Sequence, residues 1–295
     1  MNTATRRGDP AAYLFIAPYS GLFAAFVLLP LLFGLAMGFF QWELASPLPP
    51  RFIGIGNFRE LFSDHYFVAA AKATARFTLL IVPLSIVVSL GLAVGLAALK
   101  RGAAFFRAAI YVPTLLNVAV AGILWKWFLS TEFGFFNSVL AKVGLGGAGW
   151  LTDIHFALPS VVLMTLWWTV GAPTIILLAG VQAIPTTYYE AALIDGASPW
   201  KQFRHITLPL LRPVLTFVVV MNVIGSFQVF GQTYILTPSG GPGLSTLTLV
   251  QYIYQTSFEN YRLGYGAAMS GVLLLIIVGI TMIQLKLLGR LGEAK

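Results

Sequence analysis

The sequence predicts an all-α protein that crosses a membrane several times. Of its 295 residues, 58% are hydrophobic and only 9% are charged, whereas an ordinary soluble domain is about 25% charged. The mean hydropathy is +0.84. The uncharged residues gather into six stretches, each close to or above the roughly 20 residues that a helix needs to cross a bilayer. We therefore expect a polytopic membrane protein built as one transmembrane domain over residues 1–295.

The first predicted span covers residues 13–40, which carry no charge. The stretch is longer than the roughly 7–15 apolar residues of a signal-peptide core. We expect a retained helix, with a cleaved signal peptide as the alternative. Residues 41–68 are polar and rich in Pro and Gly. Within them we expect a short amphipathic helix that is entered at Asn57 and lies on the membrane surface.

Five more spans follow at shorter intervals. The second, at about 77–99, has an alternative start near Ala69. Proline inside a helix removes a backbone hydrogen bond, so kinks are expected at three positions. Tryptophans near the outer boundary of the third span are typical of interfacial anchors. The remaining spans are about 108–125, 156–181, 213–236 and 265–285. The prolines at which kinks are expected are Pro83, Pro113 and Pro173. The tryptophans near the outer boundary are Trp125 and Trp127.

The basic residues predict the orientation. Six spans place both termini on one side, and basic residues in loops near spans are retained in the cytoplasm. A cytoplasmic N-terminus puts the larger basic set inside, in Arg6, Arg7, Lys100, Arg101, Arg107, Lys201, Arg204, Arg212, Lys286, Arg290 and Lys295. The smaller set, Arg51, Arg59, Lys72, Arg76, Lys126, Lys142 and Arg262, then lies outside in longer loops. The net charge of +8 follows from this placement and does not indicate nucleic-acid binding.

Several classes of function lack the residues that they need. No predicted span contains an ionisable residue, although ion-coupled carriers usually place such groups inside the membrane. An ion-coupled secondary carrier of a small polar solute is therefore the weaker alternative. A membrane-embedded enzyme, such as a lipid-processing transferase, is weaker still. The chain has no cysteine, no P-loop, no H-E-x-x-H or G-x-S-x-G motif, and its three histidines lie far apart outside the spans. We expect no enzyme activity, no metal and no cofactor in this chain.

The long polar interruption at residues 186–212 predicts a helix–turn–helix. Thr187 and Glu190 have the T-x-x-E spacing of a capping box at the start of the first helix. Gly196 permits a sharp turn. Ser198 is a favoured N-cap residue, and Pro199 suits the first position of the second helix. The alanines of this segment, Ala191, Ala192 and Ala197, allow another surface to approach closely.

An apolar face is predicted for the second helix of this segment. Trp200, Phe203 and Ile206 follow one another at intervals of three residues, which places them on one side. The motif E-A-A, three residues, G, nine residues, I-x-L-P occurs here as Glu190–Ala192, Gly196 and Ile206–Pro209. It resembles the cytoplasmic coupling loop of permease subunits in binding-protein-dependent ABC importers. The alternative is a surface hairpin that only closes a loop between two spans.

A second resemblance extends over essentially the whole chain. It concerns carbohydrate importers of the maltose and multiple-sugar type, a family that also includes glycerol-phosphate importers. The chain looks like the first of two homologous permeases, without the extra N-terminal helices of the maltose-type subunit. The matching stretches are Ile16–Pro18, Phe52–Phe58, Leu236–Pro242, Ser245–Thr246, Tyr252–Tyr254, Phe258 and Gly264–Tyr265.

These resemblances imply the type I permease fold of ABC importers, with a cytoplasmic coupling helix. They also imply a second homologous permease, two ATPase subunits that bind ATP-Mg, an extracytoplasmic sugar-binding protein and a lipid-facing location in a bacterial or archaeal cytoplasmic membrane. The implied ATPase contacts are Tyr189, Glu190, Ala191, Ala192, Asp195, Gly196 and Ala197. Trp200 and Phe203 are expected to pack the coupling helix against the transmembrane helices of the same chain.

A sugar pathway needs aromatic rings and small polar groups at membrane depth. Asn222 and Ser226 are four residues apart and share one helix face. The alternative for each candidate is a hydrogen bond or packing contact between helices. The full set is Thr114 and Asn117 on the third span, Trp167, Trp168 and Gly171 on the fourth, and Asn222, Ser226 and Gln228 on the fifth.

Overall fold

Helices joined by short turns make up nearly all of the chain, as the sequence predicts. The structure is a computed structural model that describes residues 10–99 and 101–293, with side chains over 14–99 and 101–287. Arg6, Arg7, Lys100 and Lys295, which carry part of the orientation prediction, lie outside the described residues, as does the Arg290 side chain. Contacts divide the chain into two units. The first comprises the chain up to Ser63 together with Ile253–Leu273, and the second comprises Asp64–Tyr252 and the chain from Leu274.

The first unit begins with a long apolar helix. This helix ends at Met37 rather than near residue 40, because the chain then turns into a strand. Strands β1 and β2 pair antiparallel, with Phe40 opposite Phe52. The elements in order are α1 (Pro10–Phe23), a π-helical turn (Ala24–Leu28), α2 (Leu29–Met37), β1 (Phe40–Gln41), β2 (Arg51–Phe52), α3 (Gly56–Ser63), a second π-helical turn (Gln255–Glu259) and the first turns of α16 (Leu263–Glu293).

Asn57 has a different role from the helix entry expected of it. Helix α3 begins at Gly56, and Asn57 is buried within its first turn. Its Nδ2 donates to the carbonyl oxygens of Gly38 and Phe40, both at 2.9 Å. The side chain thus satisfies two backbone acceptors at the turn after α2, where buried carbonyls need partners. The location of α3 on a membrane surface stays a prediction.

In the second unit, α4 (His65–Ala98) starts earlier than either predicted boundary. Asp64 caps it: its Oδ1 accepts from the backbone N–H of Tyr66 at 2.8 Å and of Phe67 at 3.3 Å. The other carboxylate oxygen accepts from the Tyr252 hydroxyl at 2.7 Å. The helix has 34 residues, so it is about 51 Å long and exceeds a hydrocarbon core of about 30 Å.

Two of the three predicted proline kinks coincide with sharp bends. Helix α5 (Ala103–Tyr111) and the 3-10 turn Val112–Leu115 meet α6 (Val118–Phe128) at 98°, and α8 (Ala157–Thr169) meets α9 (Gly171–Gln182) at 51°. Pro113 lies in the first break, and Pro173 lacks the N–H that would donate to Thr169, the last residue of α8. The third and fourth spans are therefore bent pairs of helices. By contrast, α4 continues past Pro83 as one helix.

The fifth span is also interrupted, contrary to the predicted helix over 213–236. Helix α13 (Arg212–Phe227) meets the preceding stretch Pro199–Leu210 at 70° and ends before α14 (Gly231–Leu236). Among the described residues, three helices are long and apolar enough to cross a membrane, or up to six if each bent pair is one span. The six-span topology stays a prediction. The other elements are α7 (Phe135–Lys142), a 3-10 turn (Pro242–Leu244) and α15 (Leu249–Tyr254).

The two tryptophans predicted as interfacial anchors differ in environment. Trp127 is 50% exposed, but Trp125 is only 6% exposed. Trp125 packs in an aromatic cluster with Phe128, Phe136 and Trp167. Trp125 therefore stabilises the junction of α6, α7 and α8, and the anchor prediction is wrong for it.

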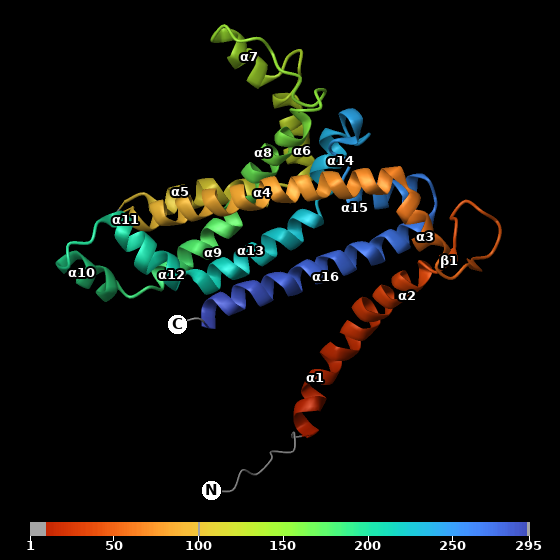
Figure 1. Cartoon of the computed structure of the whole chain (residues 1–295), viewed down its shortest axis with the longest axis horizontal. Coiled ribbons are helices and arrows are strands. Elements are labelled where there is room, and N and C mark those ends of the chain that lie inside the picture. The colour runs from red at the N-terminus through yellow and green to blue at the C-terminus, as the bar shows by residue number, and fades with distance from the viewer. Residues whose placement is uncertain (1–9, 100, 294–295) are drawn as a thin grey trace. The chain divides into compact units, whose positions relative to one another are not determined.

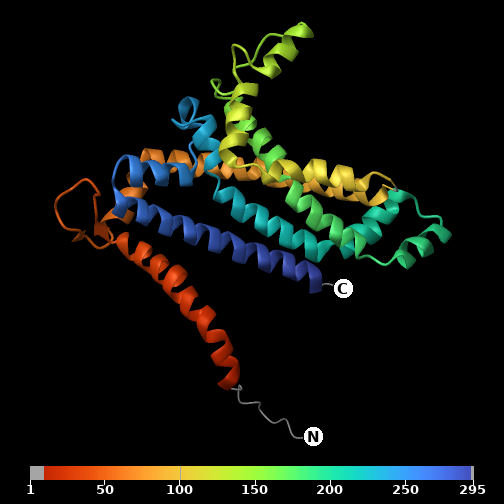
Figure 2. The same ribbon diagram turned by 180° about the vertical axis from the view of Figure 1, so that it is seen from behind.

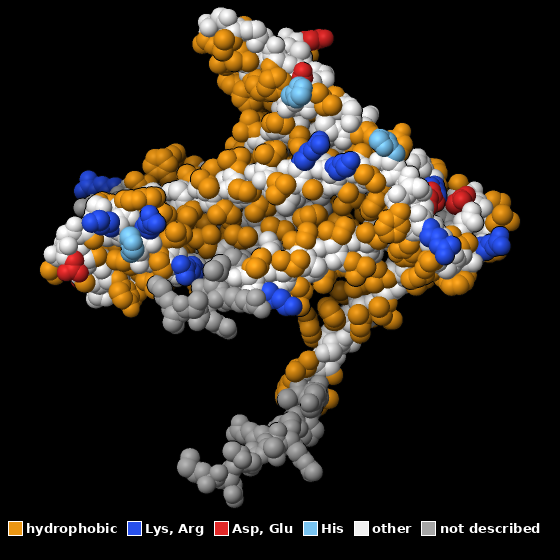
Figure 3. All heavy atoms as spheres, in the orientation of Figure 1, with side chains coloured by type: hydrophobic (Ala, Val, Ile, Leu, Met, Phe, Trp, Pro, Cys, Tyr) orange, Lys and Arg blue, Asp and Glu red, His pale blue; other side chains and the backbone are white. Residues whose placement is uncertain are grey.

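The core of the second unit lies between α4, α9 and α13, which run side by side (Figures 1 and 2). A buried apolar cluster joins them, formed by Ala93, Leu96, Leu177, Leu178, Leu211 and Val218. Large apolar side chains are also exposed on the outer faces of the helices. Figure 3 shows hydrophobic side chains along α4 and basic side chains around α10 (Thr186–Ile194) and α11 (Pro199–Gln202). Such an apolar exterior is suited to lipid rather than water.

The two glycines Gly264 and Gly279 of α16 predict opposite responses to the same substitution. A Cβ at Gly264 would overlap the Phe40 carbonyl oxygen and lie 3.0 Å from the Trp42 nitrogen, whereas one at Gly279 meets no atom within 4 Å. Gly264→Ala should destabilise the protein by about 1–3 kcal/mol. Gly279→Ala should be neutral or stabilise it by up to about 1 kcal/mol. Thermal unfolding in detergent measures both, and equal shifts would contradict the packing described here.

Candidate functional site

Residues 186–212, called the docking segment below, form the predicted helix–turn–helix. The segment contains α10, α11, a π-helical turn (Phe203–Thr207) and α12 (Leu208–Leu210). It connects α9 to α13 and lies near one end of α4 (Figure 1). Its position between two bundle helices follows from the chain itself: only Ala183–Pro185 separate it from α9, and its last residue, Arg212, is the first residue of α13.

The turn of the docking segment is a Schellman motif centred on Gly196. Gly196 has φ +70°, a conformation that costs a residue with a Cβ. Its N–H donates to Leu193 O at 3.0 Å, and the Ala197 N–H donates to Ala192 O at 2.8 Å. These two bonds satisfy carbonyls at the end of α10 that would otherwise have no partner. The turn is consequently defined by backbone hydrogen bonds.

The two predicted helix starts have different outcomes. Ser198 caps α11, with Oγ accepting from the Lys201 N–H at 3.4 Å, as predicted. The capping box of Thr187 and Glu190 is wrong. Helix α10 begins one residue earlier, at Thr186, with Pro185 at the N-cap and no side-chain cap. Thr187 is therefore already inside the first turn of the helix.

Tyr189 joins the two arms of the docking segment. Its hydroxyl lies 2.9 Å from Thr207 Oγ1, and Thr207 is 5% exposed. Trp200 stacks on Phe203 with ring centroids 5.5 Å apart. Phe203 lines a cavity of about 530 Å³ between the segment and the ends of α4 and α9, whereas Trp200 is 66% exposed. Phe203 thus faces the bundle as expected, but Trp200 does not.

The outer surface of the docking segment is more apolar than the sequence motif suggests. Glu190, Ala191, Asp195 and Gly196 are exposed, while Ala192 and Ala197 are partly buried. Residues that the motif did not single out are also exposed: Tyr188 at 53%, Leu193 at 64% and Ile194 at 88%. The apolar pair directly before the Asp195-Gly196 turn was the signal available in the sequence. Exposed apolar groups beside a charged rim are typical of protein interfaces.

A separate cavity of about 430 Å³ lies among α4, α8, α9, α13 and α14. Trp168, Asn222 and Ser226 line it, as the pathway prediction requires. The Trp168 indole N–H donates to Leu116 O at 3.0 Å, at the break between α5 and α6. The bend therefore exposes a carbonyl that orients the tryptophan ring.

Asn222 is held by hydrogen bonds on both sides of its amide. Its Oδ1 accepts from Ser85 Oγ at 3.0 Å, and its Nδ2 donates to Val218 O at 2.9 Å. Ser226 Oγ donates to Val223 O at 2.8 Å. The Ser85–Asn222 bond connects α4 to α13, and the other two bonds, within α13, orient the polar side chains of this cavity wall.

Five predicted pathway residues do not line this cavity. Gly171 packs against α5: a Cβ there would lie 2.6 Å from Ile110 O and 2.8 Å from Thr114 Oγ1. Asn117 caps α6 by accepting from the Ala119 N–H at 2.8 Å. Trp167 packs against Trp125, and Gln228 is exposed at the end of α13. A pathway role for these residues and for Thr114 stays a prediction.

Three polar residues that the sequence reasoning missed do line the cavity: Thr165, Thr169 and Gln232. Thr165 and Thr169 stand four residues apart on the helix that carries Trp168, so their shared face was readable from the sequence. Gln232 lies on α14, beyond the break that the sequence did not predict. Its position in the cavity depends on the break between the end of α13 at Phe227 and the start of α14 at Gly231.

An apolar helical chain with an exposed docking segment and a polar cavity among its helices is a membrane transport subunit. Residues 85–291 match the family model described as the binding-protein-dependent transport system inner membrane component. The chain belongs to this family. It is the membrane-embedded permease of an ABC importer, and it is a transport subunit rather than an enzyme.

Curated relatives match along most of their length. The chain is 36% identical over 281 residues to the arabinooligosaccharides transport system permease protein AraP of Bacillus subtilis, covering 95% of this chain and 88% of that protein. It is 34% identical over 278 residues to the sulfoquinovosyl glycerol transport system permease protein SmoG of Agrobacterium fabrum, with 94% and 90% covered.

A solved structure supports the fold. A chain of a bacterial alginate ABC transporter, crystallised in complex with a pentasaccharide-bound periplasmic protein, aligns with a TM-score of 0.83. The alignment covers 97% of this chain and 96% of that chain at 22% identity. The likeness therefore shows a shared permease fold.

The bond between Tyr189 and Thr207 predicts a local stability difference. Tyr189→Phe removes it, which should weaken the docking segment by about 1 kcal/mol. Amide hydrogen exchange across 186–207 should then rise about fivefold. Tyr188→Phe, at the exposed neighbouring position, is the matched control and should leave exchange unchanged. Equal exchange in both variants would show that the two arms are held by other contacts.

Proposed function

We propose that this chain forms half of the translocation pathway for a carbohydrate and transmits ATPase motion through the docking segment. The names of its relatives favour sugars or oligosaccharides: they include permeases for arabinooligosaccharides, lactose and starch degradation products. The same set includes an sn-glycerol-3-phosphate permease, so the class is polyhydroxylated solutes and their derivatives. The comparisons give no support to an ion-coupled secondary carrier.

The observation that carries this proposal is the composition of the 430 Å³ cavity. A sugar offers hydroxyl groups around its rim and flat C–H faces. Trp168 supplies an aromatic surface, and Asn222, Ser226 and Gln232 supply amide and hydroxyl groups around it. No carboxylate or basic side chain lines the cavity among the described residues. Such a lining is suited to an uncharged polar ring.

The docking segment is placed to move the walls of this cavity. Helix α9 precedes it and contributes Pro173 and Ile176 to the cavity, while α13 follows it and contributes residues from Phe217 to Ser226. Both helices are also joined to α4 by the buried apolar cluster. A displacement of the segment is therefore transmitted to two walls at once. Packed elements of this kind shift between discrete arrangements rather than deforming continuously.

We assign the partners accordingly. The exposed surface around Glu190, Ile194 and Asp195 would contact one of two ATPase subunits, which bind ATP-Mg. A second homologous permease would complete the pathway, and an extracytoplasmic binding protein would deliver the sugar. The chain would lie in a bacterial or archaeal cytoplasmic membrane with both termini in the cytoplasm, the orientation that the basic residues favour. The transport cycle would then couple ATPase closure to opening of the cavity outward.

The docking surface predicts a loss of coupling without a loss of folding. Glu190→Lys reverses an exposed charge, and Ile194→Asp places a charge on a side chain that is 88% exposed. Each should reduce co-purification of the ATPase from detergent extract by about tenfold or more and abolish transport. Recovery of the second permease should not change.

Leu145→Asp is the matched control for this experiment, since Leu145 is 59% exposed in a turn outside the docking segment. It should leave ATPase recovery at the wild-type level. Normal uptake by both docking variants would refute the coupling role. A wild-type chain that purifies alone and moves solute in liposomes without ATP would refute the importer proposal.

The two neighbouring glutamines separate two possible routes for substrate. Gln232 lines the cavity, whereas Gln228 lies at the exposed end of α13. If the cavity is the pathway, Gln232→Ala should raise the KM for transported sugar by about tenfold, because one sugar hydroxyl loses its partner. Gln228→Ala should have the smaller effect. The opposite order in reconstituted transport would place the route along the exposed edge of α13.

A further inference from the structure

A second groove, of about 750 Å³, lies beside the first half of α4, within the second unit. Its opposite walls are the segment that leads into α8 and the 3-10 turn at Pro242–Leu244 with the residue after it. We call it the basic groove. It lies outside the proposed sugar cavity, which takes its α4 residues, Phe77 and Ile81, from another face of the helix.

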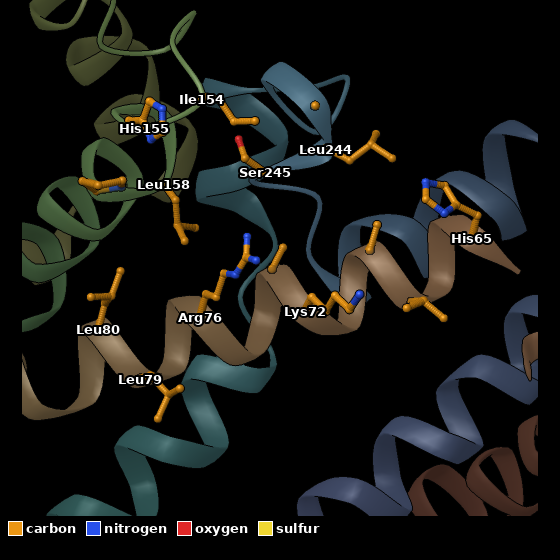
Figure 4. A pocket seen from close by; sticks show the side chains of 15 residues that line it. His65, Lys72, Arg76, Leu79, Leu80, Ile154, His155, Leu158, Leu244 and Ser245 are labelled. Carbon is orange, nitrogen blue, oxygen red and sulfur yellow. The ribbon is translucent and has the colours of Figure 1, made fainter.

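Four ionisable side chains line the basic groove, and none of them is a carboxylate. His65, Lys72 and Arg76 come from α4 at intervals of seven and four residues, which keeps them on one face. His155 comes from the opposite wall (Figure 4). Lys72 and Arg76 are exposed, and neither has a carboxylate within salt-bridge distance in the part of the chain that the structure describes. The groove thus offers the ammonium group of Lys72 and the guanidinium group of Arg76 to an anion.

Ser245 provides an independent sign of an unfilled polar contact. Its Oγ is buried and has no hydrogen-bond partner among the described residues. Figure 4 shows Ser245, the residue after the 3-10 turn, above Arg76, with its oxygen directed toward Ile154 and away from the guanidinium group. Buried hydroxyl groups normally have partners. An anion held by Arg76 would supply an acceptor for this hydroxyl once the Ser245 side chain turned toward the guanidinium group.

The rest of the lining is apolar and continues toward the membrane core. Leu79, Leu80 and Leu158 line the groove beyond the basic residues, and Leu79 and Leu80 are 73% and 46% exposed. From Phe77 to the end of α4 at Ala98 the helix carries no charge. That stretch is about 33 Å long, close to the thickness of a hydrocarbon core. A bilayer whose hydrocarbon core covers this uncharged stretch would place Arg76 at the level of the lipid phosphates.

We propose that the basic groove binds an anionic phospholipid, with its phosphate at Lys72, Arg76 and Ser245 and an acyl chain along Leu79 and Leu80. Arginine and lysine bind phosphate through charge-assisted hydrogen bonds, and the leucines match the lipid tail. An acidic protein segment or an acidic sugar would use the basic residues but leave the apolar side exposed. The leaflet in which this lipid lies follows from the orientation proposed above, whereas the binding of the lipid does not depend on that orientation.

The test measures lipid retention by the purified importer. The intact complex is equilibrated in nanodiscs of mixed phosphatidylglycerol and phosphatidylcholine, extracted, and its retained lipids are counted by native mass spectrometry. Wild type should retain phosphatidylglycerol in preference to phosphatidylcholine. Lys72→Gln with Arg76→Gln should reduce that preference about tenfold. Arg51→Gln with Lys142→Gln is the control, since it removes the same charge from exposed residues outside the groove.

Four outcomes would overturn the proposal. Equal retention by both double variants would show that the groove is not the lipid site. If the Lys72→Gln, Arg76→Gln variant retained lipid normally but captured less binding protein, the basic residues would be assigned to an acidic segment of that protein. If it retained lipid normally but showed a raised KM for an acidic oligosaccharide and not for a neutral one, they would be assigned to an acidic sugar. Inorganic phosphate that displaces a short-chain phosphatidylglycerol at equal concentration would refute the acyl-chain contact. The lipid readouts are separate from ATPase co-purification and from the effect of Gln232→Ala on KM, so failure of this proposal is distinguishable from failure of the proposed function.

Discussion

The buried apolar contact between α4, α9 and α13 is the constraint on which the second unit depends. Ala93, Leu177 and Val218 bring the three helices together through apolar contacts, and the Ser85–Asn222 hydrogen bond adds a polar contact between α4 and α13. Close approach is possible because Gly180 of α9 has no Cβ, which would lie 2.6 Å from Leu211. Small residues serve this purpose in membrane helices, where lipid is as apolar as leucine and packing must supply the association. The cavity lies on one side of this contact and the docking segment on the other.

Breaks in the helices create the polar features of this apolar chain. The interruption before α6 frees the Leu116 carbonyl, and the Trp168 indole N–H binds it. Proline prevents α8 and α9 from forming one straight helix, which brings Trp168 and Thr169 to the bend beside the cavity. Irregular backbone is tolerated at membrane depth only where protein or a water-filled cavity satisfies it. The bends and the cavity are therefore parts of one arrangement.

The docking segment is held together by hydrogen bonds of its own. The Schellman turn at Gly196, the Ser198 cap and the Tyr189–Thr207 bond satisfy polar groups within the segment itself. Its apolar outer residues Leu193 and Ile194 are 64% and 88% exposed in the part of the chain that the structure describes. The proposed contact with an ATPase subunit would account for both properties, since such a contact needs a stable and exposed surface.

The sequence by itself determined the fold class, the family, the docking motif and the Ser198 cap. Each depends on composition or on residues within a few positions of one another, and local signals of that kind are visible in a single chain. The Asp64 cap was not predicted, because the second span was expected to begin later. The bends near Pro113 and Pro173 were also local, because a missing N–H acts on the preceding turn.

Only the tertiary structure decided which distant residues meet. Asn57 reaches Gly38 and Phe40, Asn222 reaches Ser85, and Trp125 is buried by Phe136 and Trp167. No spacing rule predicts these contacts, because they follow from how separate helices bend and pack. Gln232 lines the cavity and Gln228 does not, for the same reason. In one continuous helix the two residues would share a face, but the break after Phe227 separates them.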